Sequence, residues 1–412
     1  MYKFLVLTLV TLAAAQKASY ENYQVFSILP STESQLEILR QIEDHDGFSL
    51  WKTPTLVNMT VDVMVAPDKL ADFFDLMNVL GTSYEKFIDN VQDLIDSEMP
   101  KEQLASLNGF SLNTYHTIEE IYAHLDNLAR DHSDKVQIIV GGSSYEGRQI
   151  KGVKLSLGKN KPGIVIEGGI HAREWISPAT VLYIIDRLLN SADSEISSLA
   201  KAYDWYIFPS VNPDGYVYTH TKNRLWRKTR KPYSVFCYGS DPNRNWEYRW
   251  NTGGASSNPC METYAGSSAF SDIETKSLSQ YLQSISDKFF AYISFHSYSQ
   301  LLLFPYGHTR DHLENYNDLL AVGKKSINAL AKRYGTSYRT GNIAETIYIA
   351  TGSSVDWVKG KMKKPIAYTY ELRDTGRYGF LLPANQIIPT GEETMDSLVA
   401  LFKEAAARGY PQ

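Results

Sequence analysis

Alternating hydrophobic and polar positions near the start of the chain predict a small unit of strands and helices. Strands are expected at residues 23–28, 48–51, 58–65 and 84–88. One helix should begin at a cap formed by Ser31 and run through Ile42, and a second should cover residues 67–80, beginning with a proline. The resulting order, β-α-β-β-α-β, is that of a split βαβ sandwich. No cluster of catalytic residue types falls within this unit.

The hydrophobic pattern changes after Tyr115, where helical patterns alternate with continuous apolar strands. These strands are expected at residues 136–140, 163–167, 205–209, 289–295 and 365–370. Continuous apolar strands between helices are typical of a buried sheet in an α/β domain, which is the fold class expected here. The polar, acidic segment at 89–113 reads as a connector between the two units.

The N-terminus resembles a secretory signal peptide. Lys3 precedes an apolar stretch at 4–15 that ends in three alanines. In an exported chain the two cysteines, Cys237 and Cys260, are expected to form a disulfide. The sequon at Asn58 is compatible with export. The predicted division is therefore signal peptide 1–15, N-terminal domain 16–98, connector 99–113 and main domain 114–412.

Overall composition narrows the class of partner. The 412 residues are 43% hydrophobic and 21% charged, so a long disordered stretch is not expected. The 41 basic and 46 acidic residues are interspersed and give a net charge of −5. This balance provides no electrostatic footprint for nucleic acid or for an anionic membrane. No segment after the N-terminus has the roughly 20 apolar residues that a membrane span needs.

Polar side chains follow three of the predicted strands at the point where each strand ends. His171 and Glu174 follow the strand at 163–167, His296 follows the strand at 289–295, and Glu371 ends the last strand. In open α/β sheets, ligand sites form beyond the carboxyl ends of the strands. These four side chains are therefore expected to meet at one edge of the sheet.

Three of these residues form a plausible ligand set for zinc. A catalytic zinc site uses about three nitrogen or carboxylate ligands and leaves one position for water. His171 and Glu174 lie three residues apart and can reach one ion, which His296 would complete. Each residue taken singly has a simpler interpretation, because His171 and Glu174 could be a surface pair and His296 a buried histidine of the core.

Several motifs together resemble those of the pancreatic-type zinc metallocarboxypeptidases. They are HAREW from His171, NRLWRK from Asn223, DPNRNW from Asp241, HSYSQ from His296, IY at Ile347 and ELRDTGRYG from Glu371. They occur in the order typical of the family, and the N-terminal unit is similar to the family's pro-segment. The resemblance implies a mixed, mostly parallel sheet flanked by helices, preceded by an inhibitory α+β pro-domain, in a secreted precursor.

The resemblance also implies catalytic roles. His171, Glu174 and His296 would bind one zinc ion, and Asp241 would orient a ligating imidazole. Glu371 would act as general base, whereas the alternative is a structural carboxylate paired with Arg373. Arg227 would stabilise the oxyanion.

Recognition of a C-terminal residue is implied by a further set of matches. The residues that match substrate-binding positions of the family are Arg173, Asn243, Arg244, Ser297, Tyr298 and Tyr348. A guanidinium suits this role because its planar fork binds a carboxylate in two places. Tyr348 would lie on a loop that closes over the substrate.

The pocket for the terminal side chain is expected to be apolar. Family members that prefer Lys or Arg carry an acidic residue at the position of Val355. Gly307, Ile343 and Thr369 match other pocket positions, and none of them is charged. A buried cation would find no partner there, so aliphatic or aromatic termini are expected. The adjacent Asp356 keeps the alternative of basic specificity open.

Activation requires removal of the pro-domain, and the sequence departs from the family here. No Lys or Arg lies between Glu102 and Ile121, so Lys101 is the last candidate for trypsin-like cleavage, and the alternative is activation by a protease with another preference. Expected partners are peptide and protein C-termini, an activating endoprotease and protein inhibitors. Two other rival functions are a peptide-binding protein without activity and a zinc hydrolase acting on sugars or lipids. The complete set of zinc ligands with Glu371 disfavours the first, and Arg244 with Tyr348 disfavours the second.

Overall fold

The computed structural model describes residues 17–42, 45–54, 56–98 and 110–411. The expected signal peptide at 1–15, the candidate cleavage site at Lys101 and most of the connector lie outside the described residues. Those expectations therefore stay predictions. Among the helices within the described ranges, none is both long enough and apolar enough to cross a membrane.

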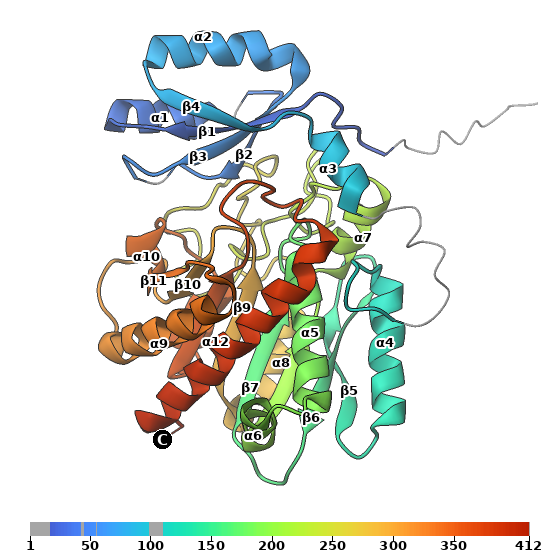
Figure 1. Ribbon diagram of the computed structural model, residues 1–412. Helices are drawn as coiled ribbons and strands as arrows, with labels where there is room; N and C mark the ends of the chain where they lie inside the picture. The colour runs from blue at the N-terminus through green and yellow to red at the C-terminus, as the bar shows by residue number, and fades with distance from the viewer. Residues whose placement is uncertain (1–16, 43–44, 55, 99–109, 412) are drawn as a thin grey trace, which may run out of the picture.

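The N-terminal unit contains a four-stranded antiparallel sheet and two helices that pack on it, and a further helix, α3 (Val91–Glu98), follows its last strand (Figure 1). Its strands, in the spatial order β2-β3-β1-β4, are β1 (Gln24–Leu29), β2 (Phe48–Lys52), β3 (Val61–Val65) and β4 (Ser83–Ile88). The helices are α1 (Glu33–Gln41) and α2 (Leu70–Leu80), with the short turn η2 (Pro67–Lys69) before the latter. The predicted order is confirmed. Phe26 of β1 stacks on Phe73 of α2 in the shared core.

The cap of α1 corrects the prediction from sequence, because Thr32 rather than Ser31 caps the helix. The Thr32 hydroxyl accepts from the backbone N–H of Gln35 at 3.2 Å, and the Gln35 side chain accepts from the Thr32 N–H at 3.1 Å. This reciprocal arrangement is a capping box. Ser31 also donates its N–H to the Gln35 side chain at 2.7 Å, so it supports the cap from one position earlier.

The larger unit is built on an eight-stranded mixed sheet. Its strands are β5 (Val136–Ser143), β6 (Gln149–Ser156), β7 (Gly163–Gly168), β8 (Asp204–Phe208), β9 (Phe289–His296), β10 (Leu301–Phe304), β11 (Arg339–Asn342) and β12 (Ile366–Glu371). The spatial order is β11-β10-β12-β9-β7-β8-β6-β5, and four of the seven neighbouring pairs are parallel. The predicted mixed, mostly parallel sheet is confirmed, whereas β6, β10 and β11 were not predicted.

Helices cover both faces of this sheet. They are α4 (Ile118–Asp131), α5 (Ile176–Asn190), α6 (Ser194–Ala202), α7 (Pro213–Thr221), α8 (Ile273–Ser284), α9 (Tyr316–Tyr334), α10 (Ile343–Thr346), α11 (Ser354–Gly360) and α12 (Ile387–Ala407), with the short turns η4 (Ser286–Lys288) and η5 (Ala384–Gln386). Ile164 and Ile166 of β7 pack in the core that includes α5 and α12, whereas Val165 packs in the core of α8 and α11. Alternate residues of this strand therefore face opposite layers.

The four central strands bring the predicted site residues to one edge. β12, β9, β7 and β8 are parallel neighbours, so their carboxyl ends lie together. Glu371 pairs directly with His296, the last residue of β9. The loop after β7 carries His171 and Glu174 before α5 begins. The chain thus delivers its polar residues to this edge while the strands below them stay buried.

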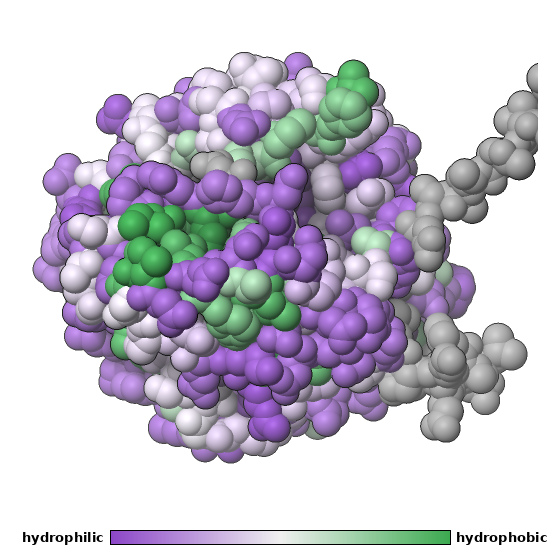
Figure 2. All heavy atoms as spheres, turned by 90° about the horizontal axis from the view of Figure 1, so that it is seen from above, coloured by the Kyte–Doolittle hydropathy of each residue, from purple (hydrophilic) through white to green (hydrophobic). Residues whose placement is uncertain are grey.

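The N-terminal unit lies over this same edge, above the ends of the central strands (Figure 1). Trp51 of β2 packs on Phe380 with 5.3 Å between ring centroids, and Tyr298 donates its hydroxyl to the Asp62 carboxylate at 2.7 Å. Trp51, Tyr298 and Phe380 belong to one buried apolar cluster that the two units share. Seen from above, apolar side chains gather on this side of the molecule amid hydrophilic ones (Figure 2).

Candidate metal and peptide-binding site

His171, Glu174 and His296 come together as predicted and form one buried cluster. The Nδ1 atoms of His171 and His296 lie 2.8 and 3.0 Å from the two Glu174 carboxylate oxygens and 3.1 Å from each other. All three residues are 2–4% exposed. The interpretation of His171 and Glu174 as a surface pair is therefore wrong.

The chemistry of this donor set fits zinc. One ligand atom from each residue lies within 4.8 Å of the others, and the set contains two imidazole nitrogens and one carboxylate. The second ring nitrogen of His171, Nε2, lies 3.1 Å from the Asp241 carboxylate, which orients the ring with Nδ1 toward the cluster. The described residues offer this single group of three or more such ligands.

Charges within the cluster depend on one another. Burial alone would raise the pKa of Glu174, but the two neighbouring histidines lower it well below its usual range. Burial opposes protonation of His296, yet the Glu174 carboxylate raises its pKa to about 9. Burial and then the Arg227 charge lower the pKa of His171. A buried carboxylate between two imidazoles attracts positive charge, which a divalent cation would supply.

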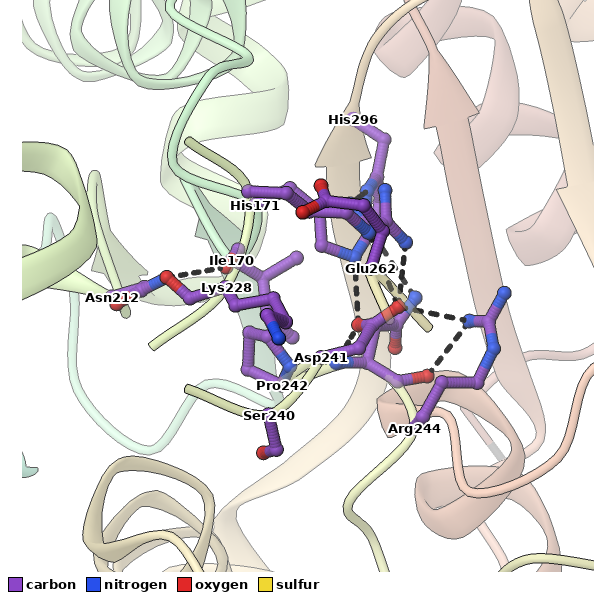
Figure 3. A network of polar contacts seen from close by, with 12 residues as sticks. Ile170, His171, Asn212, Lys228, Ser240, Asp241, Pro242, Arg244, Glu262 and His296 are labelled. Carbon is purple, nitrogen blue, oxygen red and sulfur yellow. Dashed lines mark hydrogen bonds and ion pairs between the residues drawn. The ribbon is translucent and has the colours of Figure 1, made fainter. Parts of the chain in front are cut away.

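Asp241 joins the metal cluster to the cationic side of the site. Its carboxylate accepts from Nη2 and Nε of Arg227 at 2.7 and 3.2 Å and from the Asn243 backbone N–H at 2.8 Å. The close-up in Figure 3 shows Asp241 between His171 and Arg244, whose guanidinium lies 4.0 Å away. Asp241 is fully buried, and although burial would raise its pKa, Arg227 and the other neighbouring groups lower it well below its usual range. It therefore remains a carboxylate.

Glu371 ends β12 beside His296. It lines a cavity that His171, Glu174 and His296 also line. Burial raises the pKa of its carboxyl to about 8, with His296 lowering the pKa and Glu174 raising it further. A bound divalent cation would lower this pKa by its charge. The alternative role, pairing with Arg373, is not observed, because Arg373 donates to Glu393 at 2.8 Å. Glu371 is thus left available at the cavity.

Arg244, Tyr348 and Asn243 form a polar wall beside the metal cluster, with the Asn243 amide nitrogen 3.5 Å from His296 Nε2. Nη2 of Arg244 donates to the Tyr348 hydroxyl at 3.1 Å, and Nη1 donates to the Asn243 backbone carbonyl at 3.0 Å. The Asn243 side-chain oxygen accepts from the Ser354 N–H at 3.0 Å. All three residues line the cavity, so the predicted carboxylate-binding groups lie together.

The cavity has a volume of about 670 Å³ and includes the predicted pocket for a terminal side chain. Ile343, Val355 and Thr369 line it together with the metal cluster. Gly307 is not among the lining residues, although it packs closely on two of them, because a Cβ atom at this position would lie 3.2 Å from Ile343 Cγ2 and 2.7 Å from the Ala350 carbonyl oxygen. Asp356 is fully buried but does not line the cavity.

The Asp356 carboxylate is engaged away from the cavity. It accepts from the Gly307 N–H at 2.9 and 3.0 Å, from the His308 N–H at 3.2 Å and from His308 Nδ1 at 2.9 Å. These four contacts use both oxygens. The carboxylate that kept basic specificity open therefore holds the loop behind the pocket.

The remaining predicted substrate residues, Ser297, Tyr298 and Arg173, also line the cavity. The Ser297 backbone N–H donates to the Glu174 carboxylate at 3.2 Å. The Arg173 guanidinium lies 4.1 Å from the Phe380 ring centroid and 3.4 Å from the Glu262 carboxylate. The N-terminal unit lines part of this cavity through Trp51 and Lys52, and its Asp62 carboxylate accepts from the Tyr298 hydroxyl.

Two important residues were missed from the sequence. Glu98, at the end of α3 (Val91–Glu98), forms a buried ion pair with Arg224 at 2.6 Å. Arg224 was part of a quoted motif but received no role, because a basic run does not reveal which member is buried. The expected disulfide between Cys237 and Cys260 is present.

Comparison with known proteins agrees with this geometry. Residues 121–397 match the family described as zinc carboxypeptidase, and residues 26–98 match the carboxypeptidase activation peptide. The chain is 50% identical to zinc carboxypeptidase A 1 of Anopheles gambiae, over 96% of this chain and 93% of that one. It is 40% identical to carboxypeptidase A1 of Bos taurus over the full length of both.

Solved structures show the same arrangement. The carboxypeptidase A of Helicoverpa armigera superposes with a TM-score of 0.86 at 27% identity, covering 96% of this chain and all of that one. Thrombin-activatable fibrinolysis inhibitor superposes with a TM-score of 0.87 at 32% identity, covering 94% of this chain and all of that one. A bovine form of the latter has been solved in complex with a tick carboxypeptidase inhibitor, at 36% identity and a TM-score of 0.68 over 72% of this chain and 99% of that one.

Proposed function

The chain belongs to the zinc carboxypeptidase family, and we propose that it is exported as a latent precursor whose mature form releases aliphatic and aromatic C-terminal residues from peptides and proteins. Zinc is held by His171, Glu174 and His296. The observation that carries the proposed specificity is the uncharged pocket around Val355, with Asp356 turned away and fully engaged.

Recognition of the terminal carboxylate falls to Arg244, Tyr348 and Asn243. Arg244 lines the cavity, and its guanidinium donates to the Tyr348 hydroxyl there. Its planar fork can bind both oxygens of a carboxylate, and the Asn243 amide adds a donor. An internal residue of a polypeptide has no carboxylate there, so this wall favours cleavage at the chain end.

A zinc ion held by His171, Glu174 and His296 would supply Lewis-acid activation of a water molecule and of the scissile carbonyl. Glu371 accepts the proton from the attacking water and returns it to the leaving amine. Arg227, held by Asp241 beside the metal cluster, donates to the oxygen that becomes negative during attack. Asp241 keeps the His171 ring in the orientation that metal binding needs.

Latency follows from the position of the N-terminal unit. Trp51 and Lys52 line the catalytic cavity and Asp62 bonds to Tyr298, so the N-terminal unit lies where the rest of a peptide would lie. An endoprotease that cuts the connector at 99–113 would free the cleft, and protein inhibitors are expected to bind the same surface. The disulfide and the predicted signal peptide support export.

A matched substrate series tests the specificity. From otherwise identical blocked dipeptides, the mature enzyme should release C-terminal Phe and Leu at least tenfold faster than Lys, because an unpaired buried cation costs more than about 1.4 kcal/mol. Val355→Asp should raise the relative rate for Lys, whereas Val355→Ala, which adds no charge, should not. Faster release of Lys than Phe by the unaltered enzyme would refute the proposed specificity.

A further inference from the structure

Arg339 places a positive charge in the catalytic cleft, apart from the metal ligands and the groups proposed to bind the terminal carboxylate. It begins the edge strand β11 and lines the same cavity as Glu371. Leu301 of β10 pairs with Arg339 on one side and with Glu371 on the other. Residues paired across neighbouring strands point to the same face, and two strand spacings amount to about 10 Å. The guanidinium is thus on the same face as the catalytic base and within reach of a bound peptide.

Other arginines of the cleft are committed to partners. Arg227 is bonded to Asp241, Arg173 lies against Glu262, and Arg244 is bonded to Tyr348 and backbone carbonyls. Arg339 is exposed, and within the described residues its side chain takes part in no ion pair or hydrogen bond. Its backbone N–H donates to the Gln300 carbonyl at 3.1 Å where β11 pairs with β10. The guanidinium is therefore available to a ligand.

In the latent form the N-terminal unit places a charged residue, Lys52, near Arg339. Lys52 of β2 lines the same cavity as Arg339. Burial lowers the pKa of Lys52, the Asp62 carboxylate opposes that change, and the nearby Arg339 charge adds to it. When the N-terminal unit is removed, Lys52 and Asp62 leave together. Arg339 then remains as an uncompensated cation at the cleft.

The strand register indicates which part of a substrate Arg339 would meet. Thr369 and Leu303, which line the terminal side-chain pocket, pair with each other one step deeper on the same face. Arg339 is level with Glu371, at the depth of the scissile bond rather than of the pocket. Building on the proposed carboxypeptidase function, we propose that Arg339 gives the mature enzyme a preference for an acidic side chain in the penultimate residue of its substrates.

The test compares blocked dipeptides with a C-terminal Phe preceded by Glu or Gln. These differ by one charge at nearly constant shape. An exposed ion pair changes the free energy by roughly 0.2–1 kcal/mol, so the ratio of kcat/KM, Glu over Gln, should fall by about 1.5- to 5-fold in Arg339→Gln. The ratio in the unaltered enzyme should also fall as salt is added, because the charges are screened.

Two further variants make the outcome specific. Arg339→Lys keeps the charge and should retain most of the ratio. Arg310→Gln removes an exposed arginine that does not line the cavity and should leave the ratio unchanged. An unaltered Glu-to-Gln ratio in Arg339→Gln, with normal turnover of the Gln substrate, would overturn this inference alone. Failure of the unaltered enzyme to hydrolyse either substrate would instead count against the proposed function on which it rests.

Discussion

One buried ion pair should control how firmly the pro-domain, here residues 17–98, stays on the catalytic domain. The two oxygens of Glu98 accept from Nη2 and Nε of Arg224 at 2.6 and 2.7 Å, and both side chains are 1% exposed. Arg224 also donates to the carbonyls of Arg173 and Phe380 and lies 3.7 Å from the centroid of the Trp175 ring. Among the described residues Glu98 is the one anion that pairs with Arg224, so Glu98→Ala would leave a buried guanidinium without it.

Breaking one side of a buried ion pair costs about 3–5 kcal/mol. At about 1.4 kcal/mol per tenfold, the dissociation constant of the cleaved pro-domain should rise by at least about 100-fold. Glu98→Gln keeps the shape and one hydrogen-bond acceptor, so its effect should be smaller. The assay cuts the connector of the full-length precursor, dilutes the complex and follows the concentration at which activity appears.

Glu85→Ala is the matched control, because Glu85 is an exposed carboxylate on β4 of the same domain. It should release its pro-domain at the same concentration as the unaltered protein. Release of Glu98→Ala at that same concentration would refute the reasoning, since the buried pair would then add nothing to docking.

Three further predictions concern stability and modification. Burial raises the pKa of Glu274 to about 8, so the folded protein keeps this carboxyl protonated at pH values where the unfolded chain loses the proton. The free energy of unfolding should therefore fall as the pH rises from about 4.5 toward 8. Urea unfolding between pH 5 and 9 should show a flatter pH dependence for Glu274→Gln than for the exposed control Glu119→Gln. Replacing Cys237 and Cys260 by Ser should lower the free energy of unfolding of the mature enzyme by about 3 kcal/mol, because the disulfide links residues 23 positions apart and restricts the unfolded chain. An unchanged urea midpoint would contradict this. Asn58 is exposed on the pro-domain, so a secreted precursor should lose mass on treatment with an N-glycosidase, and Asn58→Gln should not.

Much of the fold could be predicted because its signals are local. Continuous apolar runs marked β7, β9 and β12, and the polar residues at their ends correctly located the metal ligands. β11 escaped prediction because Arg339–Asn342 is a polar sequence that becomes a strand only by pairing with β10. The helix cap was misplaced by one residue because Ser31 and Thr32 are both good capping residues, and the Thr-x-x-Gln spacing decides between them.

Contacts between domains could not be predicted from periodicity. Glu98 and Arg224 are 126 residues apart, and either could have been a solvated surface charge. The orientation of Asp356 was equally inaccessible, because its neighbour Val355 faces the cavity while the Asp356 carboxylate bonds to the loop at Gly307. Such choices depend on three-dimensional packing that a single sequence does not display.

The most direct test of the account compares the mature enzyme before and after removal of zinc on two peptides that differ at one terminus. Both peptides end in Phe, one with a free carboxylate and one as the amide. The account predicts that the zinc-loaded enzyme hydrolyses the free acid and leaves the amide, that chelation abolishes activity, and that added zinc restores it. Hydrolysis of the free acid by metal-free protein, or equal hydrolysis of acid and amide, would contradict a zinc carboxypeptidase that recognises the terminal carboxylate.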